Sequence, residues 1–378
     1  MSKHVVILGA GFGGLELSTR LSETLADELH VTLIDRSDSF VFGFSKFEVM
    51  LGHQTTEDVR LPYSDFVHDG VEFRRETVTS IDPNERRVIT DGGTYDADIL
   101  VVALGAEYDH ATTPGFVEDG HEFYSIPGVE RLREVLPSFD AGSVVIAILG
   151  PTFKCPPAPF EGAFLLHDLF TRRDVRSAIR LTVINPLGPP VPISKEVSES
   201  VLRGMAERDI EFIPGHKVLG LDTGAKAVEL EGRANVPYDL FLGIPVHRVP
   251  EVVESSGLAV DGWIPVDQRN LATRFPNVYA IGDITSAPLA KAGVFAEDAA
   301  GVVAEEIAAR LRAEGDVDPF EGAGICYIEF GGGRVAKVDA NFLGGPSPRA
   351  VFHDASETHA REKQEFAASR RRRWFGRN

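Results

Sequence analysis

The chain has 378 residues, 43% of them hydrophobic and 25% charged, and its formal net charge is -19. That length allows two domains of ordinary size with buried cores. The acidic balance argues against nucleic acid as a bulk partner and against broad adhesion to anionic lipid. The exception is a short basic and aromatic stretch at residues 370–375.

No apolar stretch approaches the roughly 18 residues that a membrane span needs, and the charged start of the chain runs directly into a glycine motif. We therefore expect neither a secretion signal nor a transmembrane segment, and a cytoplasmic location. The two cysteines, Cys155 and Cys326, are too few for a disulfide framework. Judged by their number alone, they would be inert buried thiols.

The chain opens with a strand, a glycine loop, a helix and a second strand. Residues 4–8 and 31–34 are the two apolar runs, and between them Leu15, Leu17 and Leu21 recur near helical spacing. Such a βαβ unit predicts a parallel sheet and an α/β fold.

One stretch of the first half has a counterpart in the second half. Residues 71–73 begin a segment that passes a hairpin turn at 91–93 and ends in the apolar run 95–105. Residues 210–212 begin a similar segment that ends at 238–245. The repeat predicts two Rossmann-like dinucleotide-binding domains, with chance similarity between ordinary strands as the alternative.

The expected domain boundaries follow from this repeat. The first domain is discontinuous and takes residues 1–110 and 262–322, because the apolar run 275–281 returns the chain to it. The second domain takes residues 111–261, and its nucleotide site is expected to be degenerate. A short C-terminal region covers residues 323–378.

Residues 9–14, Gly-Ala-Gly-Phe-Gly-Gly, fit the GxGxxG pattern of a dinucleotide-binding loop. Its first glycine permits a tight turn, its second lets a pyrophosphate approach the backbone, and its third lets helix and strand pack closely. The helix N-terminus then attracts the phosphates. Asp35 ends the second strand at the spacing of a carboxylate that accepts hydrogen bonds from ribose hydroxyls. The cofactor-binding residues expected in this half of the site are Gly9, Gly11, Phe12, Gly13, Gly14, Asp35 and Arg36.

Two further motifs follow in order along the chain. Residues 101–105, Val-Val-Ala-Leu-Gly, and residues 277–283, Asn-Val-Tyr-Ala-Ile-Gly-Asp, each end an apolar strand. Together with the glycine loop they resemble the pyridine-nucleotide disulfide oxidoreductase superfamily. That resemblance implies FAD as the cofactor, with its ribityl chain at Asp283. The residues that it adds to the expected cofactor site are Ala103, Gly105, Gly282, Asp283 and Lys291.

The second domain has no glycine loop after its first strand. Residues 151–161, Pro-Thr-Phe-Lys-Cys-Pro-Pro-Ala-Pro-Phe-Glu, contain four prolines and a bulky phenylalanine instead. A loop stiffened by proline lacks N–H groups that would bind a pyrophosphate, so we expect no nicotinamide nucleotide there. Cys155 lies beside Lys154 and just before a predicted helix, and both features lower the pKa of a thiol.

This loop sharpens the resemblance. Residues 154–161 are similar to the first redox-cysteine motif of sulfide:quinone oxidoreductases and of the flavoprotein subunit of flavocytochrome c sulfide dehydrogenases. Residues 324–327 and 342–348 resemble the second-cysteine segment and the quinone-side loop of that group. The resemblance implies that Cys155 and Cys326 form a redox pair. Sulfide would attack one sulfur, and the electrons would pass through FAD to a quinone.

The resemblance also implies roles for single residues. Glu161 would be a general base or would tune the pKa of the sulfur site, with an ordinary first-turn helix carboxylate as the alternative. Lys291 would lie near the pyrimidine edge of the flavin, where a cation stabilises the reduced ring, with a surface lysine as the alternative. Ile325 and Phe342 would form an apolar quinone clamp, with core packing as the alternative.

Two features depart from the family pattern. The chain has no third cysteine, so the sulfur chemistry would use two. Phe42 stands near the position at which flavocytochrome flavoproteins carry a flavin-linking cysteine, so we expect FAD to be noncovalent. His167 and His247 are candidates for a proton relay, although an isolated histidine is more often structural.

Residues 362–375 are expected to form a helix that ends in four arginines followed by Trp374 and Phe375. The segment 362–378 would either lie peripherally on the inner face of the plasma membrane or be a disordered solvated tail. We expect no metal, and the sequence leaves a homodimer open.

Three alternatives to quinone-linked sulfide oxidation stay open. The first keeps the sulfur chemistry but uses a cytochrome or another soluble acceptor. The second is an NAD(P)H-driven quinone or disulfide reductase, against which the missing second glycine loop argues. The third is a noncatalytic flavin redox sensor.

Overall fold

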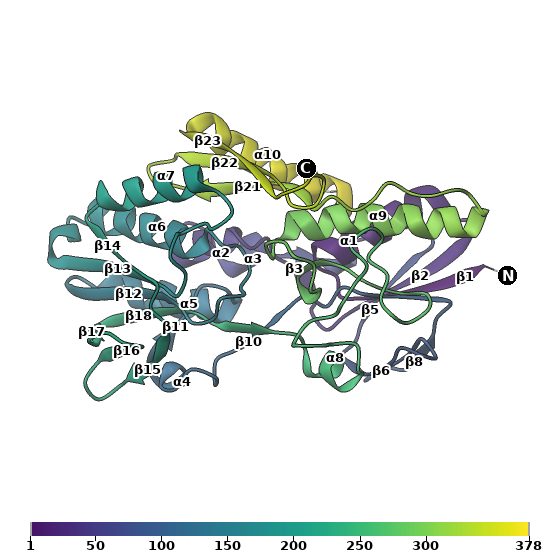
Figure 1. Cartoon of the computed structure of the whole chain (residues 1–378), viewed down its shortest axis with the longest axis horizontal. Helices are drawn as coiled ribbons and strands as arrows, with labels where there is room; N and C mark the ends of the chain where they lie inside the picture. The colour runs from purple at the N-terminus through teal and green to yellow at the C-terminus, as the bar shows by residue number, and fades with distance from the viewer. Residues whose placement is uncertain (1, 377–378) are drawn as a thin grey trace.

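The computed structural model describes residues 2–376, which form two α/β halves side by side with a C-terminal layer across them (Figure 1). Each half contains a five-stranded parallel sheet. In spatial order, the first sheet consists of β20 (Val278–Ala280), β9 (Ile99–Val102), β1 (Lys3–Leu8), β2 (Leu29–Asp35) and β5 (Val71–Arg75). The second consists of β11 (Gly120–His121), β18 (Leu240–Ile244), β12 (Gly142–Ile148), β13 (Ile179–Asn185) and β14 (Ile210–Pro214).

The central strands of both sheets are buried on both faces, as parallel sheets covered by helices are. Val5 and Ile7 of β1 belong to one core cluster, whereas Val6 and Leu8 belong to another, because successive side chains of a strand point to opposite faces. The helices that pack on the sheets are α1 (Phe12–Leu25) and α9 (Gly293–Arg312) in the first half, and α5 (Ile126–Val135), α6 (Ala158–Arg172) and α7 (Lys195–Ala206) in the second.

The repeat expected from the sequence is present in three dimensions, which confirms the α/β fold with two Rossmann-like units. In each half an outer parallel strand leads into a three-stranded antiparallel unit and then into the strand beside β1 or β12. The antiparallel units are β6 (Val78–Asp82), β7 (Arg87–Thr90) and β8 (Thr94–Asp96), and β15 (Val218–Asp222), β16 (Ala227–Leu230) and β17 (Val236–Pro237). The domain boundaries themselves stay predictions.

The chain crosses between the halves at β10 (Glu107–Asp109) and β19 (Val246–Arg248), which pair antiparallel. The shorter elements are β3 (Ser39–Phe40), β4 (Leu61–Pro62), α2 (Ser45–Met50), α3 (Thr56–Val59), α4 (Phe116–Asp119) and α8 (Glu251–Ser255).

The C-terminal layer is an antiparallel sheet followed by one helix. Its elements are β21 (Ala323–Glu329), β22 (Val335–Asn341), β23 (Arg349–Ser356) and α10 (Glu357–Phe375). Strand β21 contacts both α6 and α9. Cys326, Val338 and Phe352 are neighbours across the three strands, and all three pack against the core of the second half. The layer therefore brings Cys326 close to α6, the helix that begins just after Cys155.

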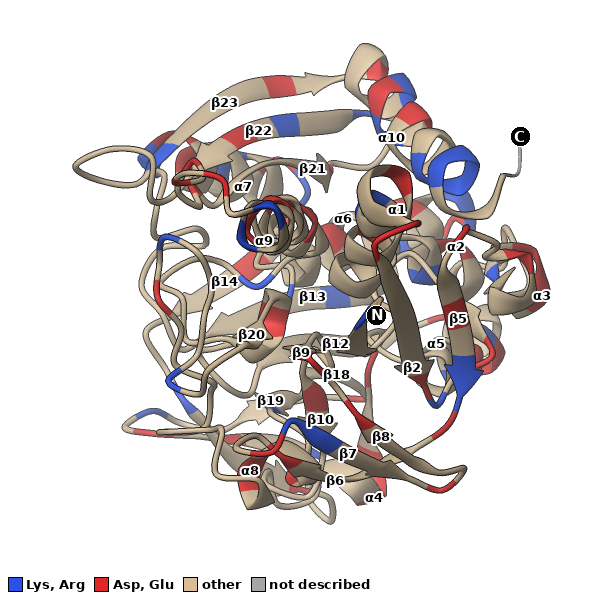
Figure 2. Cartoon of the chain, turned by 90° about the vertical axis from the view of Figure 1, so that its right-hand side faces the viewer, with Lys and Arg blue, Asp and Glu red and all other residues tan. Residues whose placement is uncertain are grey.

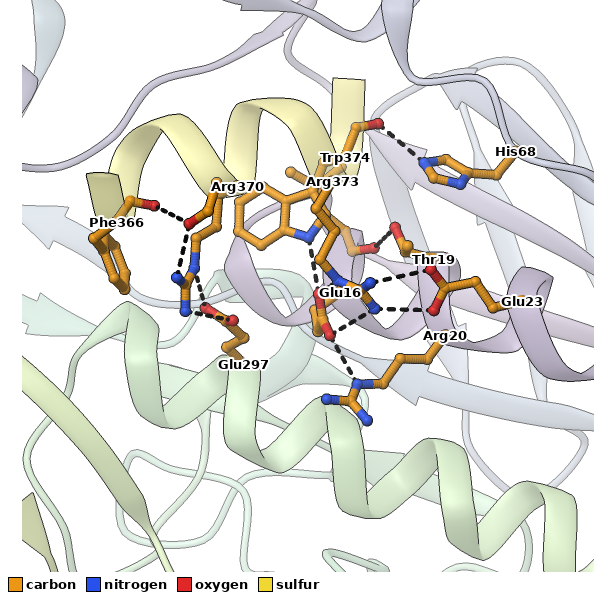
Figure 3. A network of polar contacts seen from close by, with 12 residues as sticks. Glu16, Thr19, Arg20, Glu23, His68, Glu297, Phe366, Arg370, Arg373 and Trp374 are labelled. Atoms are coloured by element: carbon orange, nitrogen blue, oxygen red, sulfur yellow. Dashed lines mark hydrogen bonds and ion pairs between the residues drawn. The ribbon is translucent and has the colours of Figure 1, made fainter. Parts of the chain in front are cut away.

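The end of α10 lies near α1 (Figure 2), and a buried carboxylate of α1, Glu16, fixes it there (Figure 3). Glu16 is 1% exposed and accepts hydrogen bonds from Arg373 Nε at 2.8 Å and Trp374 Nε1 at 2.9 Å. Arg20 Nε donates to the same carboxylate at 2.7 Å. Burial raises the pKa of Glu16, but these donors lower it by more, so it lies below its ordinary value. The Trp374 ring packs edge-on against Phe12, with 5.6 Å between ring centroids.

This docking corrects the expectation for the basic tail. Trp374 and Phe375 are buried, and Arg370 pairs with Glu297 at 2.8 Å. The alternative of a disordered tail is therefore wrong for residues 357–375, and the two aromatic residues face the core of the protein. Membrane contact by this segment stays a prediction, and its residues 377–378 lie outside the described part. Within residues 2–376, no helix is both long enough and apolar enough to cross a membrane.

Replacing Arg373 by alanine is expected to lower the free energy of unfolding by about 3 kcal/mol, because Glu16 would stay buried without its main cation. Arg372 is the matched control, since it precedes Arg373 in α10 but pairs with the exposed Glu365. Its replacement by alanine should cost less than about 1 kcal/mol. Urea denaturation followed by circular dichroism measures both, and equal losses would contradict the role assigned to Glu16.

Candidate functional site

The glycine loop between β1 and α1 depends on close backbone approach at two positions. Gly9 has a φ of +101°, and a Cβ on it would lie 2.4 Å from the Ala103 carbonyl oxygen. A Cβ on Gly14 would lie 1.9 Å from the Gly9 carbonyl oxygen. A Cβ on Gly11, by contrast, would meet nothing within 4 Å. Positions 9 and 14 thus need glycine for the fold, whereas position 11 faces the open space that a pyrophosphate would enter.

Asp35, at the end of β2, holds this loop in place. Its Oδ2 accepts a hydrogen bond from the Ala10 N–H at 2.8 Å, and the buried Tyr63 hydroxyl donates to the Ala10 carbonyl oxygen at 2.7 Å. Arg36 is exposed, and its Nη1 lies 2.9 Å from the Glu107 carboxylate. Contacts of Asp35 and Arg36 with a ribose stay predictions.

The other two glycine-loop residues contribute packing. The Phe12 ring lies against Trp374, and a Cβ on Gly13 would lie 3.0 Å from Ile281 Cδ1. Gly105, after β9, has a φ of +65°, a conformation that favours glycine.

The second part of the expected cofactor site follows β20. Gly282 has a φ of +79° and leads into Asp283. Burial raises the pKa of Asp283, and the cations of Lys154 and Lys291 oppose that shift. Lys291 Nζ donates to the Asp283 carbonyl oxygen at 2.6 Å and lies 3.4 Å from the centroid of the Trp263 ring. Lys291 is therefore half-buried and bonded to the backbone, and burial lowers its pKa to about 8. Its place at the flavin edge stays a prediction.

These residues fit an FAD molecule. Gly11, Gly105 and Asp283 follow β1, β9 and β20, which are adjacent parallel strands. Ligands of open α/β sheets bind at the carboxyl ends of such strands. The open space at Gly11 suits a pyrophosphate, and the buried carboxylate of Asp283 suits a group rich in hydroxyls.

Cys155 lies in a strained turn that is hydrogen-bonded to the backbone of the expected cofactor site. Its φ is +53°, in the left-handed region that costs a non-glycine residue about 1 kcal/mol. The Cys155 N–H donates to the Lys291 carbonyl oxygen at 2.8 Å, and its own carbonyl oxygen accepts from the Ala158 N–H at 2.9 Å. Both bonds hold the thiol at the start of α6, next to the segment that carries Lys291.

Glu161 connects the two cysteine segments. It is 3% exposed, its Oε2 lies 3.9 Å from Cys155 Sγ, and its Oε1 accepts the Glu329 N–H at 3.0 Å. Burial raises the pKa of Glu161 to about 7. Burial also raises the pKa of Cys326 to about 12, and the Glu161 carboxylate contributes to that rise. Glu161 is therefore more than a first-turn carboxylate, because it interacts with both thiols.

The two thiols also lie close enough to interact with each other. Both are free thiols, and a charge on Cys326 raises the pKa of Cys155. Cys155 is exposed as a residue and Cys326 is partly buried, while neighbouring groups surround both sulfurs. The structure thus brings Cys155, Cys326 and Glu161 into one electrostatic environment. Their role as a redox pair stays a prediction.

The structure contradicts the expectation that Lys154 and the helix start lower the pKa of Cys155. Lys154 Nζ donates to the Ala106 carbonyl oxygen at 3.0 Å and so points to the interdomain crossing. Burial raises the pKa of Cys155 well above its ordinary value, and Glu161 raises it further. The Ala158 N–H lowers it, but by less. The expectation was wrong because desolvation outweighs the favourable backbone contact.

Sequence reasoning missed the cation that does act on this site, Lys363 of α10. It is buried, and its Nζ lies 2.7 Å from Glu329 Oε1. Its charge lowers the pKa of both Cys155 and Glu161. No motif surrounds Lys363 in the sequence, and the only signal was the predicted helix that carries it.

The two residues of the expected quinone clamp have different surroundings, and their contact with a quinone stays a prediction. Phe342 is buried in a small core cluster, edge-on to Phe295 with 5.2 Å between ring centroids. Ile325 is 37% exposed on β21. The packing of Phe342 thus matches the core alternative. On the same layer, Phe366 of α10 lies 6.1 Å from the Tyr327 ring centroid, a contact that the sequence did not reveal.

The two histidines have structural surroundings. His167 Nδ1 accepts a hydrogen bond from Arg176 Nε at 2.9 Å. His247 is buried between the rings of Tyr108 and Tyr124, with centroids 5.0 and 5.5 Å away. Burial, assisted by nearby lysines, lowers the pKa of His247 to about 3. Because His247 stays neutral near neutral pH, a structural role is favoured over a proton relay.

Comparison with known proteins shows similarity over nearly the whole chain. A family model described as pyridine nucleotide-disulphide oxidoreductase matches residues 3–154 and 158–304. The mitochondrial sulfide:quinone oxidoreductase of Mus musculus is 23% identical over 376 residues, which cover 94% of this chain and 81% of that protein. A type II NADH:quinone oxidoreductase of Staphylococcus saprophyticus is 42% identical over 300 residues, which cover 75% of each. The X-ray structure of the sulfide:quinone oxidoreductase from Aquifex aeolicus matches with a TM-score of 0.88 and 25% identity, over 97% of this chain and 90% of that chain.

Replacing Gly11 by alanine should leave the fold intact but weaken FAD binding at least about tenfold, since the new methyl group would occupy the space of the pyrophosphate. The matched control is Gly150→Ala in the second half, where a Cβ would lie 3.4 Å from the Val246 side chain, an ordinary contact. That variant should keep its flavin. The flavin-to-protein absorbance ratio after gel filtration measures both, and full flavin in Gly11→Ala would refute the assigned cradle.

Glu161 is expected to be half protonated near pH 7, because burial raises its pKa to about 7. A carboxyl band in infrared difference spectra of the wild type against Glu161→Gln should disappear with a midpoint near that pH. The folded protein holds this proton in a pH range where the unfolded chain has lost it. The wild type should therefore lose stability relative to Glu161→Gln as the pH rises from about 4.5 to about 7. A band already absent at pH 5 would contradict the assignment.

Proposed function

Because the chain belongs to the pyridine nucleotide-disulphide oxidoreductase family, we propose that it oxidises sulfide, or a related persulfide or thiol, through Cys155 and Cys326 and passes the electrons to a quinone. The chain is an enzyme of the flavoprotein class, with FAD as its cofactor. Its relatives that are named sulfide:quinone oxidoreductase support the substrate and the acceptor.

The observation that carries the proposal is the shared site of the two thiols and Glu161. The turn before α6 supplies Cys155, α6 itself supplies Glu161, and β21 supplies Cys326. The Cys155 turn is hydrogen-bonded to Lys291, whose ammonium contacts the carbonyl oxygen of Asp283 in the expected cofactor site. Thiol chemistry and flavin chemistry would therefore take place next to each other.

The residues can perform a thiol–disulfide exchange with a sulfur nucleophile. In the oxidised enzyme, hydrosulfide would attack one sulfur of a Cys155–Cys326 disulfide. The bond between the two cysteines breaks, a new sulfur–sulfur bond forms, and a persulfide and a free thiolate result. The electron pair of the broken bond stays on that thiolate. FAD supplies the two-electron acceptor when it is bound.

Glu161 is suited to move the proton in this exchange. Its pKa of about 7 matches a group that gives and takes a proton near neutral pH. Its Oε2 lies 3.9 Å from Cys155 Sγ, a distance within reach of a sulfur donor. Since burial raises the pKa of Cys155, that residue is a thiol unless a base removes its proton. Glu161 is the nearest candidate base.

NADH-driven quinone reduction is the second candidate, favoured by the 42% identical type II NADH:quinone oxidoreductase. The loop after β12 argues against it. A Cβ on Gly150 would make only an ordinary contact, so this loop has no position like Gly14 at which the backbone requires glycine. Prolines and Cys155 occupy the rest of the turn. A cytochrome or another soluble acceptor would leave the sulfur chemistry unchanged.

We propose that the protein acts in the cytoplasm and peripherally at the inner face of the plasma membrane, where a quinone is available. The basic residues on the exposed side of α10 would supply such a contact. A homodimer stays a prediction.

Replacing Cys155 by serine should slow flavin reduction by sulfide at least about a thousandfold, because serine cannot enter a disulfide or form a persulfide. Cys326→Ser should behave alike. The measurement is anaerobic titration with sulfide followed through flavin absorbance, then addition of a short-chain quinone to restore the oxidised spectrum.

Dithionite should reduce the flavin in all variants, which controls for cofactor loading. Full retention of reduction by sulfide in Cys155→Ser would overturn the thiol pair. Reduction of the wild type by NADH, and not by sulfide, would favour the second candidate.

A further inference from the structure

Lys363 is a buried lysine that lies far along the sequence from the motifs that define the fold. It is 9% exposed, its Nζ lies 2.7 Å from Glu329 Oε1, and it lies 5.1 Å from the centroid of the Phe44 ring. Burying an ammonium is unfavourable unless opposite charge surrounds it. The carboxylates around Lys363 must therefore neutralise its positive charge, and Lys363 must in turn neutralise their negative charge.

A short series of contacts links Lys363 to the thiols. Lys363 binds the Glu329 carboxylate, the Glu329 N–H donates to Glu161 Oε1, and Glu161 Oε2 lies 3.9 Å from Cys155 Sγ. The groups that act on the thiol site come from several parts of the chain. They are Tyr124, Cys155, Glu161, Cys326, Glu329 and Lys363. Lys363 is the one cation of this set.

The position of Lys363 is fixed independently of the thiol site. Downstream along α10, Arg373 and Trp374 bind the buried Glu16 of α1, and Arg370 binds Glu297 of α9 (Figure 3). A helix fastened in this way loses little further freedom when one of its lysines points into the protein. The docking of α10 thus delivers a preorganised charge to the cysteines.

We propose that Lys363 is a positioning residue that offsets the negative charge of the thiol site and so allows Cys155 and Cys326 to ionise. It acts through Glu329 and Glu161 and without contact to the sulfur substrate. The inference rests on the proposed function in that it concerns the same two thiols, but it predicts their reactivity in the absence of any substrate.

The direction of the effect follows from the charges. Ionisation of either cysteine adds a negative charge beside Glu161, and among the groups named above Lys363 carries the positive charge that compensates it. Removing the ammonium should therefore raise the pKa of the thiols, and removing the Glu329 carboxylate should lower it. One unit in the pKa of a thiol changes its thiolate fraction about tenfold at a pH below the pKa.

The test is the pH profile of alkylation by iodoacetamide in the reduced, flavin-loaded protein, with Cys155 and Cys326 quantified separately by peptide mass spectrometry. We expect Lys363→Gln to slow alkylation about tenfold at pH 8 and to shift the midpoint upward. Lys363→Arg keeps the charge and should restore a profile close to the wild type. Lys337→Gln is the matched control, since Lys337 lies on β22 and pairs with the exposed side chains of Asp339 and Glu362.

Each outcome decides the proposal. An unchanged profile in Lys363→Gln would overturn it, as would an arginine variant that reacts as slowly as the glutamine variant, because packing and not charge would then be responsible. If Lys363→Gln fails to fold, Glu329→Gln decides, with an expected downward shift and an unchanged or upward shift as the contrary result. A shifted alkylation profile in a protein whose flavin sulfide does not reduce would support the positioning role of Lys363 and refute the proposed sulfide oxidation.

Discussion

The hydrogen bond from the Cys155 N–H to the Lys291 carbonyl oxygen joins the two halves of the site. It links the loop after the first strand of the second sheet to the segment that follows Asp283 in the first. Because Cys155 takes a left-handed conformation, this bond also compensates part of the strain in its turn. The bond fixes the loop before α6 against the cofactor side, while the buried first turn of α6 packs in the core of the second half and carries Glu161. The chemistry that we propose depends on this contact, because it brings the thiol of one half beside the cofactor side of the other.

Buried charge is the second constraint, and the C-terminal helix satisfies it in two places. At one end of α10, Arg373 compensates the buried Glu16 on the helix that follows the glycine loop. Nearer the start of α10, Lys363 compensates the acids around the thiols. Removing one partner of a buried pair costs more than the pair contributes, because the other charge is left desolvated. The same helix is therefore held by the cofactor domain and acts on the sulfur site.

Local patterns were sufficient to predict the fold and the positions of the motifs expected to bind the cofactor. The glycine loop, the strand-ending Gly282-Asp283 and the repeated hairpin units are encoded in short stretches, and each was found where expected. The electrostatics of the thiols could not be predicted in this way. The pKa of Cys155 is set by desolvation and by Glu161, whereas its sequence neighbour Lys154 turns toward Ala106. Lys363 was missed for the same reason, since only tertiary packing decides which face of a helix meets a site.

The two halves show how one fold plan can support different chemistry. In the first half, the turn after β1 carries glycines whose Cβ atoms would clash with backbone carbonyls, so the loop is tight. In the second half, the turn after β12 starts at Gly150, which is free of such a clash, and continues through prolines to Cys155. Proline removes N–H groups that a phosphate would need, and it also favours a fixed helix start. A turn of this composition is therefore poorly suited to a nucleotide and well suited to the rigid support of a thiol. Because both turns lie at the carboxyl ends of parallel strands, that thiol is brought to the place where this fold presents reactive groups.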